Sequence, residues 1–174
     1  MQRPVRFEQA IARKYPEGVA LAIVRDERGV DNPITLGWTM ITSQRPPLLA
    51  MAVALTHHSR ELLENAKEFV LCFPNHEMAA ECLFYGTHSG RDLNKFGERP
   101  LRRMPASKVN GILLTDAVAN FECTLYSQMV TGDHMLFVGQ VEAAHMNEDP
   151  SLQRLYTLKT GFVMGKASEM EGSR

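Results

Sequence analysis

The sequence predicts a mainly β domain with a few peripheral helices. Three observations predict this class: apolar strand-like segments recur at short intervals, turn-forming residues separate them, and helical segments are few. Strands joined by turns favour a closed or half-closed antiparallel barrel over an alternating βαβ fold. No G-x-G-x-x-G motif follows the first strand, so a dinucleotide-binding Rossmann unit finds no support.

Six segments have the composition and alternation of strands. They cover residues 19–24, 34–41, 48–55, 69–73, 119–130 and 134–143. The second and third are separated by Arg45-Pro46-Pro47, which cannot continue inside a sheet. The last two flank Thr131-Gly132-Asp133, a strong hairpin signal. In the fifth, Glu122 is expected on the face opposite Phe121 and Cys123.

Three segments are predicted as helices: residues 7–14, 59–66 and 76–84. The second has an apolar stripe that includes Leu62 and Leu63, and Ser59 is expected to be its N-cap, ahead of Glu61. These helices are short, so we expect them to cover the barrel rather than to form its core.

Length and composition fit one globular domain over residues 1–174, with 44% apolar and 22% charged residues. A net charge of −1 argues against a nucleic-acid-binding domain. No apolar run approaches 18 residues and the N-terminus has no apolar signal segment, so neither a membrane span nor secretion is expected. Cys72, Cys82 and Cys123 form no C-x-x-C pair, which indicates reduced core thiols in a cytoplasmic protein.

The window from Ser89 to Lys108 is locally basic. It contains Arg91, Lys95, Arg99, Arg102, Arg103 and Lys108 against only Asp92 and Glu98. Such a cluster in a nearly neutral chain predicts a patch that recruits phosphate, although a solvated, flexible loop has the same composition. Ser59 and Arg60 offer further anion contacts at a helix N-terminus, where plain N-capping is an equally valid interpretation.

Two other side chains are candidates for a ligand site. His134 follows a Gly-Asp turn and opens an apolar strand, so its imidazole either contacts a ligand or bonds nearby backbone. Trp38 is the single tryptophan, and an indole in a strand is usually part of the core. The histidines and cysteines lack paired zinc spacing, and no G-x-S-x-G motif supplies a nucleophile, so neither a metal site nor a serine hydrolase is predicted.

Several short motifs occur in one order along nearly the whole chain. They are Ala20-Leu21-Ala22-Ile23-Val24, Asn32-x-x-Thr35-x-x-Trp38, Ser43-x-x-Pro46-Pro47, Ser59-Arg60, Glu68-Phe69-Val70, Ser89-Gly90-Arg91-Asp92-x-x-Lys95-Phe96, Phe121-Glu122-Cys123 and Gly132-Asp133-His134-x-Leu136-Phe137-Val138-Gly139. In order and spacing they resemble the flavin reductase-like family of FMN-binding split barrels, which includes flavoredoxin and ferric reductase-type proteins.

The resemblance implies a six-stranded antiparallel Greek-key barrel, a homodimer, and FMN near the subunit interface. Lys95 and Ser59 would hold the phosphate, Trp38 would border the isoalloxazine, and His134 would be the catalytic residue at its polar edge. The full cofactor-binding set implied is Asn32, Trp38, Thr39, Met40, Ser43, Ser59, Arg60, Ser89, Arg91, Lys95, His134 and Phe162.

The implied activity is an oxidoreductase that takes electrons from NADH or NADPH and passes them through flavin to free flavin, a ferric complex or a partner protein. Two alternatives stay open: a flavoredoxin-type electron carrier without nucleotide turnover, and a barrel that binds another ligand such as haem. This chain departs from the family pattern at Arg45, where an acid is usual, and at Cys72, where asparagine is common. These departures concern the substrate preference more than flavin binding.

Overall fold

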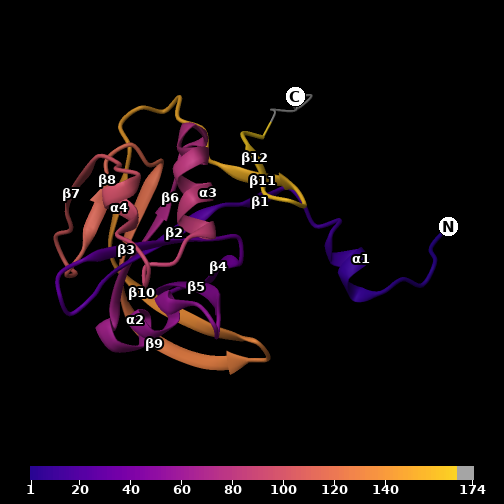
Figure 1. Cartoon of the computed structure of the whole chain (residues 1–174), viewed down its shortest axis with the longest axis horizontal. Helices are drawn as coiled ribbons and strands as arrows, with labels where there is room; N and C mark the ends of the chain where they lie inside the picture. Colours follow the sequence, from indigo (N-terminus) through magenta and orange to yellow (C-terminus); the bar gives the residue numbers. More distant parts are fainter. Residues whose placement is uncertain (168–174) are drawn as a thin grey trace.

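The computed structural model describes residues 1–167, and its centre is a curved, antiparallel seven-stranded sheet (Figure 1). The hydrogen-bonded order of its strands is β3-β2-β6-β9-β10-β5-β4. Their bounds are β2 Ala20–Arg25, β3 Asp31–Leu36, β4 Thr39–Gln44, β5 Pro47–Ala54, β6 Glu68–Phe73, β9 Ala119–Thr131 and β10 His134–Met146. The predicted mainly β class is confirmed.

The remaining elements are short and lie around this sheet. One small sheet contains β1 (Glu17–Gly18), β11 (Tyr156–Lys159) and β12 (Val163–Gly165), and another pairs β7 (Arg103–Pro105) with β8 (Ile112–Leu114). The helices are α1 (Phe7–Ile11), α2 (His58–Ala66), the 3-10 turn η1 (His76–Met78), α3 (Ala79–Thr87) and α4 (Lys95–Glu98). Within residues 1–167, no helix has both the length and the apolar character that crossing a membrane requires.

The sequence prediction of one strand over residues 34–41 is wrong, because the chain breaks at Gly37 and Trp38. Strand β3 ends at Leu36 and β4 begins at Thr39, yet these two strands occupy opposite ends of the hydrogen-bonded order. A two-residue link can join them only if the sheet curves until its edges meet. The break therefore closes the barrel, and it gives seven central strands where the family resemblance implied six.

Two apolar clusters lie on opposite sides of β2, which explains its continuous apolar sequence. Leu21 and Ile23 pack with Tyr85 of α3. Ala22 belongs to the other cluster, inside the barrel, with Phe137 of β10. The three cysteines are free and buried, as predicted, and burial raises their thiol pKa values, that of Cys123 to about 12.

Helix α1 stands apart from the body of the molecule on an N-terminal arm (Figure 1). It is shorter than the predicted helix over residues 7–14, and none of its residues is buried. Helix α3 packs over β3 instead, where the Thr35 hydroxyl donates to the Cys82 carbonyl at 2.6 Å. The C-terminal end of α3 and the N-terminal end of α2 border the candidate site.

Candidate functional site

A cavity of about 370 Å³ opens between the start of α2, the end of α3 and the loop that precedes α4. We call it the Lys95 cavity. Its lining includes Ser59, Ser89, Arg91 and Lys95, four of the residues that the resemblance assigns to the cofactor. These residues come from segments up to 36 positions apart, since Ser59 and Lys95 are brought together by packing of α2 and α4 near β3.

Lys95 is a buried cation, with only 3% of its surface exposed. Its ammonium Nζ donates to the carbonyl oxygens of Pro33 and Tyr85, each at 2.8 Å. Among residues 1–167 no carboxylate forms an ion pair with it. Burial lowers its pKa to about 8, and an ammonium group has a third donor to offer. An anion that entered the cavity would compensate this charge.

Ser59 also lies buried at this cavity, but it is not the N-cap that the sequence predicted. Helix α2 begins at His58, and the capping residue is His57, whose side chain makes no capping hydrogen bond. The Ser59 hydroxyl instead accepts a hydrogen bond from Asn32 Nδ2 at 2.8 Å. Because Ser59 sits inside the first turn, its hydroxyl can contact a ligand without giving up a cap.

Asn32 links this cavity to strand β3, and one of its polar atoms has no partner in the protein. Its Oδ1 is buried and accepts no hydrogen bond from the described residues. A Cβ atom at Gly90 would lie only 2.1 Å from that oxygen. Glycine at position 90 therefore lets the loop come close to Asn32, a requirement that the sequence pattern did not reveal.

The prediction of one basic patch over residues 89–108 is wrong, because these side chains do not form a single surface. Arg99 and Arg103 place their guanidinium groups over aromatic rings. Arg102 bonds a carboxylate, with its Nε 2.9 Å from an Asp116 oxygen. Of the basic residues in that window, Lys95 and Arg91 line the cavity. The arginines at positions 99, 102 and 103 do not gather at the cavity, because each contacts a different neighbour.

Arg60 lies outside the residues that line the Lys95 cavity. Its guanidinium bonds Glu64 one turn along α2, at 2.6 Å. Arg91 does line the cavity, and it also bonds Glu61 at 2.8 Å. Both arginines are thus held by carboxylates of α2, and Lys95 is the better candidate for an uncompensated positive charge.

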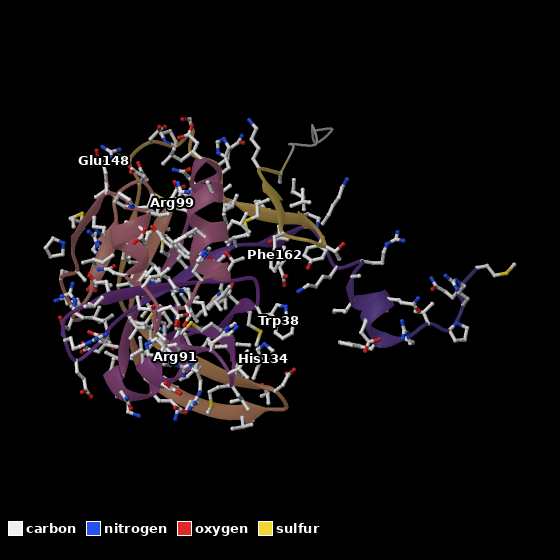
Figure 2. All side chains as sticks on the ribbon, viewed as in Figure 1. Trp38, Arg91, Arg99, His134, Glu148 and Phe162 are labelled. Atoms are coloured by element: carbon white, nitrogen blue, oxygen red, sulfur yellow. The ribbon has the colours of Figure 1, made fainter. Side chains whose placement is uncertain are left out.

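A second cavity of about 210 Å³ lies beside the first, and we call it the Trp38 cavity. Both cavities touch Gly86 and Thr87 at the end of α3. Trp38 and Phe162 line the second cavity. In Figure 2 these two residues and His134 lie on the same side of the molecule, while Arg91 lies farther along the body. The two cavities together could hold a ligand with an anionic end and a planar end.

Trp38 and His134 form the planar part of this region. Their ring centroids are 4.6 Å apart, with 34° between the planes. Trp38 is 50% exposed, so the interpretation of this residue as part of the core is wrong. It lies where the barrel edges meet, because it belongs to the two-residue link between β3 and β4.

His134 begins β10 and is oriented by its neighbour in the turn. Its Nδ1 lies 2.6 Å from Asp133 Oδ1, and this bond lowers the pKa of Asp133. A carboxylate at Nδ1 fixes the proton on that nitrogen, which leaves Nε2 for other contacts. The sequence interpretation that His134 bonds nearby backbone is therefore replaced by a bond to a side chain.

The other predicted contacts lie around this end of the site. Thr39, Met40 and Ser43 belong to the edge strand β4 and do not line either cavity, although Met40 is 57% exposed. The Ser43 hydroxyl accepts a hydrogen bond from the Arg45 backbone. Phe162 lies in the turn between β11 and β12 and has a left-handed backbone, with φ of 60°.

Sequence reasoning missed His57, which lines the Lys95 cavity together with Ser59. Its backbone is extended and its side chain is solvent-exposed. The only sequence signal was a histidine pair, His57-His58, directly ahead of a predicted helix. That signal is weak, because exposed histidines near helix ends are common.

Comparisons with known proteins point to one family. The model of the flavin reductase like domain matches residues 12–163. An uncharacterized protein from Archaeoglobus fulgidus is 32% identical over 115 residues, which cover 65% of each chain. The NADH-dependent FMN reductase AsuE2 of Streptomyces nodosus subsp. asukaensis is 26% identical over 76% of this chain and 70% of its own.

A comparison with solved structures supports the same family. An FMN-binding protein from Thermus thermophilus, crystallised with p-hydroxybenzaldehyde, superposes with a TM-score of 0.84 and 25% identity. That match covers 100% of this chain and 97% of the other. Because the family model spans all seven strands of the central sheet, the chain belongs to the flavin reductase-like family.

Proposed function

We propose that this protein is an FMN-dependent oxidoreductase that takes electrons from NADH or NADPH and passes them to an acceptor. The observation that carries the proposal is Lys95. A buried ammonium bonded to carbonyl groups opens onto a cavity, and the second cavity beside it is bordered by Trp38, whose ring lies next to that of His134. A phosphate attached to a planar ring system matches both features.

The residues present fit FMN. Lys95 and the Ser59 hydroxyl would bind the phosphate, and the buried, unpartnered Asn32 Oδ1 would accept a hydrogen bond from a ligand hydroxyl nearby. Trp38 would border the ring system, and His134 would present Nε2 to its polar edge. Bound flavin supplies the redox chemistry, because it accepts an electron pair as hydride from a reduced nicotinamide and passes electrons on.

In this scheme His134 holds a hydrogen bond rather than supplying the reacting electrons. The Asp133 carboxylate keeps the imidazole in one tautomer and one orientation, which would leave Nε2 free to bond the ligand. Trp38 and Phe162 would shield the ring end from one side, and both are at least half exposed in the single chain. Two relatives support the proposal: one is named an NADH-dependent FMN reductase and the other an FMN-binding protein.

A homodimer is part of the proposal, supported by large apolar side chains that the single chain leaves exposed. They lie on edge strand β4 and on the outer end of β9. These residues are Met40, Ile41, Tyr126, Met129 and Val130, each more than half exposed. A second copy of the chain would remove some of this apolar surface from water. Light scattering after size exclusion would measure the mass, and a monomer of 19.5 kDa would contradict this part.

The first experiment is an absorption spectrum of the protein as purified, followed by titration with FMN. We expect flavin bands in the blue and near-ultraviolet, or their appearance in bound form on titration. A Soret band would indicate haem instead. Protein that is colourless and takes up no FMN would overturn the proposal.

The second experiment follows the oxidation of NADH and of NADPH by the FMN-loaded protein. Turnover with either nucleotide, in the presence of free flavin or a ferric complex, supports the oxidoreductase. Flavin binding without turnover would reduce the function to that of an electron carrier. Comparing acceptors in the same assay would identify the class that the enzyme reduces.

A further inference from the structure

His57 occupies a distinctive place at the Lys95 cavity. It immediately precedes α2, and its extended backbone (φ −77°, ψ 135°) carries the chain from β5 into the helix. Its side chain lines the cavity and forms no hydrogen bond or ion pair with any described residue. Of the other two histidines that line this cavity, His58 Nδ1 lies 3.5 Å from a Glu61 oxygen without forming a hydrogen bond, and His88 Nδ1 lies 3.1 Å from the Phe84 carbonyl oxygen.

The charges around His57 come from three different elements. Lys95 faces it from α4, and His134 faces it from β10, whose turn is tied to the same loop by the bond from Leu55 N to Asp133 O at 3.0 Å. Arg91 and Asp92 also line the cavity, with Arg91 bonded to Glu61. Desolvation, together with electrostatic interactions with His134 and Lys95, lowers the pKa of His57 below its usual 6.5.

We propose that His57 binds the flavin phosphate in its protonated form, so that FMN binding takes up a proton at this histidine. This inference rests on the proposed function, because it requires that the phosphate occupies the Lys95 cavity. In the flavin-free protein, desolvation and the nearby charges lower the pKa of His57, which favours its neutral form. A phosphate bound beside Lys95 would offset these charges, and a protonated imidazole would then gain a charge-assisted hydrogen bond.

The sign of the effect follows from linkage. The phosphate raises the pKa of His57 in the complex above its value in the free protein. The extra affinity is therefore fully present below the pKa of the free protein, and it is lost as pH rises through the pKa of the complex. Riboflavin lacks the phosphate and should not couple to His57.

The test is isothermal titration calorimetry of the full-length protein with FMN at pH 6.5 in two buffers of different ionisation enthalpy. The number of protons taken up is compared between wild type and His57→Gln. We expect the variant to take up fewer protons and to bind FMN about tenfold more weakly, with riboflavin affinity unchanged. The phosphate's own titration is common to both proteins and cancels in the comparison.

His88→Gln is the matched control, since His88 lines the same cavity but is bonded to the Phe84 carbonyl. It should leave the proton number unchanged. Equal proton uptake in wild type and His57→Gln, an equal change in His88→Gln, or parallel weakening of FMN and riboflavin would each overturn the assignment. Failure of the wild type to bind either flavin would instead overturn the proposed function. His57 is exposed, so His57→Gln should melt as the wild type does.

Discussion

Glu122 and Lys95 are two buried charges that the fold treats in opposite ways. Glu122 is fully buried, and five donors surround its carboxylate: the backbone N–H groups of residues 107, 108 and 109, the Ser107 hydroxyl and His145 Nε2. Lys95 is almost as buried, but it has two carbonyl partners and no carboxylate among the described residues.

The pKa values of these two residues differ for the same reason. Burial alone would raise the pKa of Glu122, but the hydrogen bonds outweigh it and lower the pKa to about 2, so the carboxylate stays charged. Nothing comparable offsets the burial of Lys95, whose pKa falls to about 8, toward the neutral form. A satisfied buried charge holds a loop in place, whereas an uncompensated one beside a cavity is suited to bind an opposite charge.

The largest effect is expected at Glu122, the buried charge whose hydrogen bonds are satisfied. Glu122→Gln should lower the free energy of unfolding by about 3–5 kcal/mol, because an amide cannot accept from all five donors. The wild type should also lose this stability as pH falls from 4.5 toward 2, since the folded pKa is the lower one. Urea denaturation at several pH values measures both effects.

The control for that experiment is Glu142→Gln, which changes an exposed carboxylate on the neighbouring strand. It should shift stability by less than about 0.5 kcal/mol. If Glu122→Gln were equally mild, the contrast between the two buried charges would not stand. Flavin affinity should change little in folded Glu122→Gln, because this carboxylate binds the loop before β8.

The next largest effect is expected at Lys95, the buried charge without a compensating carboxylate. Lys95→Met should weaken FMN binding by about 1.5–3 kcal/mol, roughly 10–150-fold, through loss of a charge-assisted contact. Riboflavin, which has no phosphate, should bind almost as before. Fluorescence titration with both ligands gives the ratio, and Lys159→Met serves as a control because Lys159 is exposed. Equal losses for both ligands would remove the phosphate role.

A smaller effect is expected at the wall of the same cavity. Gly90→Ala would place a methyl group 2.1 Å from Asn32 Oδ1, so the loop or Asn32 must shift. We expect a cost of about 1–3 kcal/mol in stability and weaker FMN binding. Gly111→Ala is the matched control, since its nearest neighbour would lie at 3.5 Å. Unchanged stability and flavin affinity in Gly90→Ala would show that this close approach has no importance.

The mildest test uses pH alone. Because Lys95 has a pKa of about 8 in the flavin-free protein, FMN affinity should decline as pH rises above 8, by at most about tenfold per pH unit. The phosphate is already a dianion there, so its own titration does not contribute. Titrations at pH 7.5, 8.5 and 9.5 would show the slope. Lys95→Met should show none, and a flat wild-type profile would contradict the role of this charge.

Much of the fold could be predicted from the sequence, because strand periodicity and turn residues are local signals. The runs that became β2, β5, β6, β9 and β10 were identified within a few residues of their bounds. The break at Gly37–Trp38 could not be predicted, since an apolar run shows no sign of passing from one sheet edge to the other. Glu122 was expected on the face opposite Cys123, but nothing local indicated that a loop would cover it.

The sequence by itself determined the strand pattern, the order of motifs that marks the family, and which residue types could meet a phosphate and a ring. The tertiary structure alone decided which of those residues meet. It scattered the basic window, placed Lys95 against a carbonyl 62 positions away, and exposed Trp38 where the barrel closes. The reason is physical: periodicity and turns depend on neighbouring residues, whereas burial and charge compensation depend on partners that only the folded chain brings together.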